Sequence, residues 1–213
     1  AHGIELPATR QAAGKDGTGH IRIHLAHEGN DVSVTFEDDG AGLDLARILE
    51  KAFAQGLPVT EVRIVSRTEA SAQALAARAR ALGLKAQVTG NPDAALAHCP
   101  LVVTCTPADR VVLSARARPD AFIAAVGAFT PAMVELSPSL CRQCAEGGGI
   151  WLDTADARHE AGDLLQAGLP VDTFPTLQAL VRGGAATAPR QGPVLFKSCG
   201  WAGWDLAAAR AAC

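Results

Sequence analysis

The chain has 213 residues, of which 48% are hydrophobic and 19% charged, a composition typical of a globular protein with one large domain or two small ones. Its formal net charge of -3 gives no electrostatic reason to expect nucleic acid or an anionic membrane as a partner. No apolar run reaches the roughly 18 residues needed to span a bilayer, and no signal segment opens the chain, so we expect a cytoplasmic protein.

The first quarter of the chain predicts a β-hairpin followed by a helix. Residues 20–25 and 32–36 alternate apolar and polar side chains, and residues 29–31 between them supply a turn. Residues 40–42, with the sequence Gly-Ala-Gly, then precede a pattern with helical periodicity. A strand, a glycine turn and a helix in this order predict the phosphate-binding turn of a dinucleotide fold, with strand 32–36 as its first strand.

From residue 61 onward, short strands alternate with helices. Strands are expected at residues 62–65, 86–88, 101–104, 121–126, 149–152 and 194–196, and helices at residues 70–82 and 92–98. Residues 101–104 and 121–126 are unbroken apolar runs, which are typical of strands buried on both faces. The alternation predicts an α/β fold, a doubly wound Rossmann-like parallel sheet with helices on both faces, preceded by the β-hairpin.

The segment Ser66-Arg67-Thr68 directly follows a predicted strand, at the edge where doubly wound sheets bind their ligands. A dehydrogenase that selects NAD needs an acidic residue at this place for the ribose hydroxyls. A hydroxyl beside an arginine instead suits the 2′-phosphate of NADP. The alternative is an ordinary solvated turn.

Two further strand ends carry small or polar residues. In the first, Thr104-Cys105-Thr106, small side chains let the backbone approach a ribose or nicotinamide. The second is Val126-Gly127-Ala128, where a flat ring can be covered. Among the six cysteines only Cys141 and Cys144 stand close together, without a second pair or a nearby histidine to complete a tetrahedral metal site. We therefore expect ordinary thiols and no metal, with a zinc or redox pair as the alternative.

Four segments, residues 61–67, 102–107, 125–131 and 196–200, occur in an order and spacing that resemble the ornithine cyclodeaminase/mu-crystallin family. Within the family they are most similar to the branch that reduces the cyclic imines Δ1-pyrroline-2-carboxylate and Δ1-piperideine-2-carboxylate. The resemblance covers about residues 53–213, which are expected to form the dinucleotide-binding domain. The substrate and dimer domain of the family has no counterpart in residues 1–52.

The resemblance implies NADP (NADPH) as the cofactor, hydride transfer to an imine, a small cyclic imino acid as substrate and a homodimer. Phe129 stands where the cyclodeaminases have an aspartate, which argues for reduction, or for binding without turnover. Asp153 is expected to border the cleft, and no catalytic residue is assigned because the family's substrate lysine has no counterpart. The expected cofactor-binding residues are Gly40, Ala41, Gly42, Ser66, Arg67, Thr68, Thr104, Cys105, Thr106, Val126, Gly127, Ala128, Lys197 and Ser198.

Residues 1–52 resemble a different family, the ATP-binding domain of a chemotaxis-type histidine kinase. The resemblance rests on residues 2–5, 13–15, 26–30 and 38–44, and it implies that Asp38 would accept a hydrogen bond from adenine. We infer a chimera joined within about residues 42–53. Two alternatives to a reductase therefore stay open: a chimeric or engineered fold without catalysis, and an ATP-binding kinase fragment.

Overall fold

The structure is a computed structural model that describes residues 7–28, 31–38, 59–106, 109–183, 191–201 and 203. The chain divides into two compact units, the first made of Ala1–Val88 with Asp205–Cys213 and the second of Thr89–Trp204. The predicted glycine turn at residues 40–42 and the helix after it lie outside the described residues. No helix in the described part of the chain is both long and apolar enough to cross a membrane.

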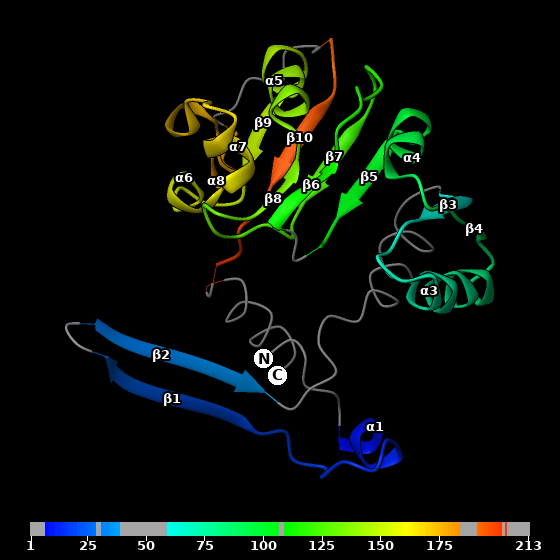
Figure 1. Ribbon diagram of the computed structural model, residues 1–213, viewed down its shortest axis with the longest axis vertical. Coiled ribbons are helices and arrows are strands. Elements are labelled where there is room, and N and C mark those ends of the chain that lie inside the picture. The colour runs from blue at the N-terminus through cyan, green and yellow to red at the C-terminus, as the bar shows by residue number, and fades with distance from the viewer. Residues whose placement is uncertain are drawn as a thin grey trace. The chain divides into compact units, whose positions relative to one another are not determined.

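The first unit contains the predicted hairpin. It follows a short helix, α1 (Pro7–Ala12). Strands β1 (Ile21–Glu28) and β2 (Asp31–Asp38) pair antiparallel, with Glu28 opposite Asp31 and Ile21 opposite Asp38 (Figure 1). Two alternating segments separated by a short polar turn are thus sufficient to predict this pairing.

The first unit also contains one parallel β-α-β element, formed by β3 (Glu61–Ile64), α3 (Glu69–Ala81) and β4 (Lys85–Val88). The Thr68 side chain caps α3 by accepting a hydrogen bond from the Ser71 amide. Gly83 follows the helix with a φ of +84°, a conformation that glycine adopts without strain. Buried in this element are Ile64, Ala72, Ala76, Ala79 and Leu84.

The second unit is built on a parallel sheet of four strands in the order β5-β7-β10-β9 (Figure 1). Its strands are β5 (Leu101–Thr104), β7 (Phe122–Ala125), β9 (Gly149–Leu152) and β10 (Val194–Lys197). The pairing register places Thr104 opposite Ala125, Ala125 opposite Lys197, and Lys197 opposite Leu152. The carboxyl ends of all four strands are therefore level, which brings the turns after them to one edge.

The remaining elements of the second unit connect these strands. They are α4 (Pro92–His98), β6 (Asp109–Leu113), β8 (Val134–Leu136), α5 (Pro138–Glu146), α6 (Ala157–Glu160), α7 (Gly162–Gln166), η2 (Val171–Thr173) and α8 (Leu177–Val181). Strands β6 and β8 pair in parallel beside the main sheet, and α5 packs on β9 and β10. Only α4 among these elements was predicted.

The core of the second unit lies between the sheet and its helices, with Ile123, Ile150 and Leu195 at most 1% exposed. The predicted α/β class with parallel strands is confirmed. The expectation that β5 and β7 are buried on both faces is wrong. Val103, in β5, is 46% exposed, and Phe122, at the start of β7, is 42% exposed.

Candidate functional site

The turns that follow β5, β7 and β10 lie side by side at the carboxyl edge of the four-stranded sheet. This edge brings together the predicted residues of the second unit, namely Thr104, Cys105, Thr106, Val126, Gly127, Ala128, Lys197 and Ser198. The segment 66–68 belongs to the first unit, and residues 40–42 lie outside the described part.

A buried carboxylate, that of Glu135 in β8, holds the turns after β5 and β7. Its Oε1 accepts hydrogen bonds from the Thr106 amide and hydroxyl, each at 2.7 Å. Its Oε2 accepts from the Thr104 hydroxyl at 2.9 Å, the Gly127 amide at 2.9 Å and the Ala128 amide at 3.3 Å. Because these five donors come from the end of β5 and from the turns after β5 and β7, Glu135 fixes the position of one turn relative to the other.

The two turns also touch directly at Gly127. A Cβ atom on this residue would overlap the backbone nitrogen and oxygen of Thr106 and would lie 2.5 Å from Glu135 Oε1. Gly127 is thus required for close approach between the turns, and this is a physical reason for a glycine at the end of β7.

A second carboxylate, that of Asp153, joins the turn after β10 to the end of β9. Its Oδ2 accepts hydrogen bonds from the Ser198 hydroxyl at 2.8 Å, the Cys199 amide at 2.9 Å and the Gly200 amide at 2.8 Å. Its Oδ1 accepts from the Thr154 amide at 2.7 Å. Asp153 is 3% exposed, so it holds the turn after β10 from the interior of the protein.

An ion pair in the core connects these parts. Lys197 Nζ lies 3.1 Å from Asp163 Oδ2 and donates a hydrogen bond to the Ala128 carbonyl. Asp163 Oδ1 in turn accepts from the amides of Glu135 and Leu136, at 2.6 and 2.8 Å. The Lys197 ammonium therefore faces the interior, and its role in this edge is to hold Ala128.

Sequence reasoning missed Glu135 and Asp163. Each has a signal in the sequence, because Glu135 stands between Val134 and Leu136 and Asp163 precedes two leucines. A charged residue inside a short apolar run is buried only when it has partners. The partners are not identified by the sequence, and several of them lie 27 or more residues away along the chain.

The outer surface of the edge is partly apolar. Val126 is 41% and Phe129 is 52% exposed, although both follow a strand whose centre is buried. Cys105 is exposed between the two threonines that bind Glu135. Partial burial of its thiol and, second, the negative charge of Glu135 raise the pKa of Cys105. Exposed apolar side chains beside tightly turned backbone fit a flat aromatic ring.

In the first unit, Ser66 and Arg67 are exposed and Thr68 is engaged as the cap of α3. The Thr68 hydroxyl donates to Ser71 Oγ at 2.7 Å. The guanidinium of Arg67 has no acceptor among the residues that the structure describes. A free arginine beside a serine, at the start of a helix, provides the chemistry that recognises a phosphate monoester.

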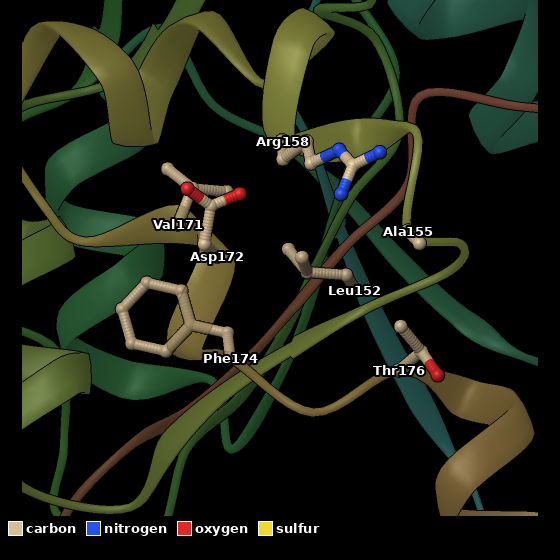
Figure 2. Close-up of a pocket in the computed structure, with 7 residues that line it drawn as sticks. All are labelled: Leu152, Ala155, Arg158, Val171, Asp172, Phe174 and Thr176. Carbon is tan, nitrogen blue, oxygen red and sulfur yellow. The ribbon is translucent and has the colours of Figure 1, made fainter.

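A separate hollow of about 280 Å³ lies in the second unit. Figure 2 shows the Phe174 ring and Leu152 beside it, with the side chains of Arg158 and Asp172 at its rim. Arg158 Nε donates to His159 Nε2 at 3.1 Å. The lining residues, none of them predicted as site residues, are Leu152, Ala155, Arg158, Val171, Asp172, Phe174 and Thr176.

The cysteine pair is part of the core. Cys141 and Cys144 are both 0% exposed. Burial raises the pKa of Cys144 to about 12, and burial together with the charge of Asp163 raises the pKa of Cys141 further. Both thiols are therefore protonated near neutral pH, and they pack among the apolar side chains of the core. In the described ranges no three His, Cys, Asp or Glu residues are grouped to hold a metal ion.

Comparison with known proteins finds relatives for both parts of the chain. The model of the ornithine cyclodeaminase/mu-crystallin family matches residues 25–212. The Δ(1)-pyrroline-2-carboxylate/Δ(1)-piperideine-2-carboxylate reductase of Azospirillum brasilense is 40% identical over 151 residues, which are 71% of this chain and 46% of that protein. Chemotaxis protein CheA of Klebsiella aerogenes is 48% identical over 60 residues, which are 28% of this chain and 9% of that protein. Both resemblances predicted from the sequence are confirmed.

A solved structure gives the same fold. The Thermococcus litoralis Δ(1)-pyrroline-2-carboxylate reductase in complex with NADH and L-proline superposes with a TM-score of 0.64 at 18% identity. The alignment covers 73% of this chain and 50% of that one. The chain thus spans about half the length of the reductases it matches. The predicted Rossmann-like fold class is confirmed.

Proposed function

The chain belongs to the ornithine cyclodeaminase/mu-crystallin family, and from this premise we propose that it binds NADP(H) as the cofactor half of a cyclic imino acid reductase. One observation carries the proposal. The turns after three parallel strands are level at one edge, and two buried carboxylates, Glu135 and Asp153, hold them in place. Such an edge is where doubly wound sheets bind dinucleotides.

The residues at this edge suit a nicotinamide nucleotide. Gly127 and Ala128 offer a tight backbone turn, and the exposed side chains of Val126 and Phe129 offer an apolar surface for a flat ring. The hydroxyl hydrogens of Thr104 and Thr106 point to Glu135, so these two residues would contact the nucleotide through other atoms. When bound, the cofactor supplies a hydride for the carbon of an imine.

The proposed preference for NADPH over NADH rests on the first unit. Arg67 is an exposed cation without an acceptor in the described part of the chain, and Ser66 precedes it. An arginine and a hydroxyl at the end of the second strand of a Rossmann fold would hold the 2′-phosphate that NADPH carries and NADH lacks.

Reduction of an imine needs more than a cofactor site. Binding energy for the substrate carboxylate must come from positively charged groups that orient the imine against the cofactor. The second unit's edge presents no exposed lysine or arginine among its predicted residues, because the Lys197 side chain is fully buried. We therefore propose that this chain, taken alone, binds NADPH and does not turn over Δ1-pyrroline-2-carboxylate or Δ1-piperideine-2-carboxylate.

We further propose that the protein is a cytoplasmic homodimer. Light scattering that finds a strict monomer would contradict the dimer.

An NADPH titration followed by nicotinamide fluorescence tests the proposal, with NADH and ATP titrated beside it. Saturable binding that prefers NADPH supports the assignment and justifies assays with both cyclic imines. No saturable binding of NADPH at millimolar concentration contradicts it. Measurable turnover of either imine by the chain alone would contradict only the claim that the substrate site is incomplete.

A second candidate function comes from the match to CheA, which covers 28% of the chain. We infer that residues 1–52 derive from the ATP-binding domain of a chemotaxis-type histidine kinase and that the chain is a composite of two origins. An ATP-binding role for this part would appear as protection of residues 2–56 from proteolysis by an ATP analogue. Equal digestion with and without the analogue excludes this role.

A further inference from the structure

The charges beneath the turns after β5 and β7 do not cancel. Lys197 Nζ is paired with Asp163 at 3.1 Å, and these two charges offset each other. Glu135 is 0% exposed and has no ion-pair partner within the described residues, so its five hydrogen bonds all come from neutral donors. The buried group of Glu135, Asp163 and Lys197 therefore has a formal net charge of -1 (two carboxylates and one ammonium).

The hydrogen bonds of Glu135 suit a carboxylate, which only accepts. Backbone N–H groups cannot rotate, and both oxygens accept from such groups, Oε1 from Thr106 and Oε2 from Gly127 and Ala128. An amide in this place would turn its NH₂ group toward one set of these N–H groups. The negative charge is thus fixed beneath the turns by the hydrogen bonds that hold them.

The field of this charge acts at the surface of the edge. Cys105 is exposed, and the charge of Glu135 is the second cause, after burial of the thiol, that raises the pKa of Cys105. Cys105 lies between Thr104 and Thr106, both of which donate to Glu135. Any group that binds against these turns experiences the same negative potential.

We propose that Glu135 is a specificity-determining residue that favours the oxidised form of a nicotinamide cofactor over the reduced form at the turns after β5 and β7. This inference rests on the function proposed above. The oxidised ring carries one positive charge and the reduced ring carries none, while the rest of the cofactor is the same in both. A fixed buried anion therefore attracts the oxidised ring more strongly than the reduced ring. Removing the anion should weaken binding of the oxidised form more than binding of the reduced form.

The test is the ratio of the dissociation constants for NADP⁺ and NADPH in three variants and the wild type. Glu135→Gln removes the charge, and we expect it to weaken NADP⁺ relative to NADPH by about tenfold, the size expected for one charge acting across a partly solvated site. Glu135→Asp keeps the charge at a shorter reach. Thr104→Val removes one hydrogen bond to the same carboxylate and keeps its charge. Both are expected to weaken the two forms equally.

The outcomes separate this inference from the function on which it rests. If the wild type binds neither form, the proposed function fails and the inference fails with it. If both forms bind and Glu135→Gln leaves their ratio unchanged, or Thr104→Val changes it as much, only the inference is overturned, since Glu135 then acts through structure alone.

The Cys105 thiol supplies a readout that needs no cofactor. The rate of its alkylation by iodoacetamide as a function of pH, followed by peptide mass spectrometry, gives its pKa. We expect a raised midpoint in the wild type and in Glu135→Asp, and a lower midpoint in Glu135→Gln. Should Glu135→Gln not fold, the wild type still decides through the cofactor itself. Tighter binding of NADP⁺ than of NADPH supports the inference, and equal or weaker binding of NADP⁺ overturns it.

Discussion

Lys197 and Asp163 form an ion pair with a distance of 3.1 Å between Nζ and Oδ2, and both side chains are almost completely buried. Each partner also holds backbone of a neighbouring element. Lys197 donates to the Ala128 carbonyl after β7, and Asp163 accepts from the Glu135 amide in β8. The end of β10 is thereby tied to the elements that position the turn after β7.

Replacing Lys197 by methionine should destabilise the second unit strongly. The substitution keeps most of the side-chain volume but leaves Asp163 as a buried charge without its counter-ion, a change that costs about 3–5 kcal/mol. Denaturant unfolding followed by circular dichroism measures the loss.

The double variant Lys197→Met/Asp163→Asn is the matched control for this ion pair. The asparagine keeps the oxygen that accepts from the amides of Glu135 and Leu136 and removes the uncompensated charge. We expect the double variant to be more stable than Lys197→Met alone. A double variant that is less stable by the sum of the two single changes would show that the two charges do not interact.

Gly127→Ala should disrupt the contact between the turns after β5 and β7. The added methyl group would overlap the backbone of Thr106, which cannot move without breaking its hydrogen bonds to Glu135. We expect a loss of about 1–3 kcal/mol in unfolding free energy, as for other overpacked sites, and weaker NADPH binding. Gly90→Ala is the control, because a Cβ on Gly90 meets nothing within 4 Å and its φ is not positive. Equal effects of both substitutions would contradict the close approach.

Asp93 should make the second unit sensitive to acid. Burial works to raise the pKa of this carboxyl, but hydrogen bonds from Ser114 and Ala115 outweigh it, so the pKa is lowered. A lowered pKa in the folded state stabilises the protein above the unfolded-state pKa of about 3.9, and this stabilisation is lost as the pH falls through the folded-state value. Asp93→Asn should therefore cost about 1 kcal/mol at pH 7, allowing for screening by solvent.

The measurement for Asp93 is unfolding of the wild type and of Asp93→Asn between pH 2 and pH 7. The difference in stability is expected to be constant near neutral pH and to close below about pH 4. A difference that persists unchanged to the lowest pH would mean that the charge of Asp93 contributes nothing.

The buried thiols should be inert in the folded protein. Burial raises the pKa of Cys144 to about 12 and is also the main cause of the raised pKa of Cys199, likewise about 12. At pH 8 we expect iodoacetamide to modify exposed Cys105 and to leave Cys141 and Cys144 unmodified until denaturant is added. Rapid modification of this pair in the native state, or its protection by zinc, would support the metal or redox alternative.

The main strands were predictable from the sequence because each is a short segment with several apolar residues and the segments alternate with helical patterns. Six strands lie where the sequence predicts them, namely β3, β4, β5, β7, β9 and β10. Strand β8 was missed because it has three residues and a charged one at its centre, Glu135. Its burial depends on five donors, two of them in the turn just before β8 and three in residues 104–106, and local patterns carry no information about these contacts.

The location of the candidate site could be predicted from the sequence, but the buried residues that hold its turns in place could not. Polar and small residues at strand ends identified the turns at 104–106 and 126–128, since ligand sites of parallel sheets lie there. The sequence does not show that the threonine hydroxyls point inward to Glu135, or that the Lys197 side chain is buried. Those directions follow from tertiary packing, and whether each predicted residue contacts a cofactor stays a prediction.

Arg67→Ser should remove the preference for NADPH. Arg67 is exposed and has no acceptor in the described part of the chain, so its guanidinium is available to a phosphate. Loss of one charge-assisted interaction with the 2′-phosphate should weaken NADPH by about tenfold or more and leave NADH unchanged, because NADH lacks that group. Arg63→Gln removes the same charge four residues earlier, from a surface pair with Glu61 at 3.5 Å, and should change neither affinity. Calorimetric titration of both nucleotides into the three proteins measures this. The prediction is contradicted if Arg67→Ser weakens NADPH and NADH equally, or if Arg63→Gln weakens NADPH as much as Arg67→Ser does. Either result would mean that the net charge of the protein sets the affinity and that Arg67 does not contact the 2′-phosphate.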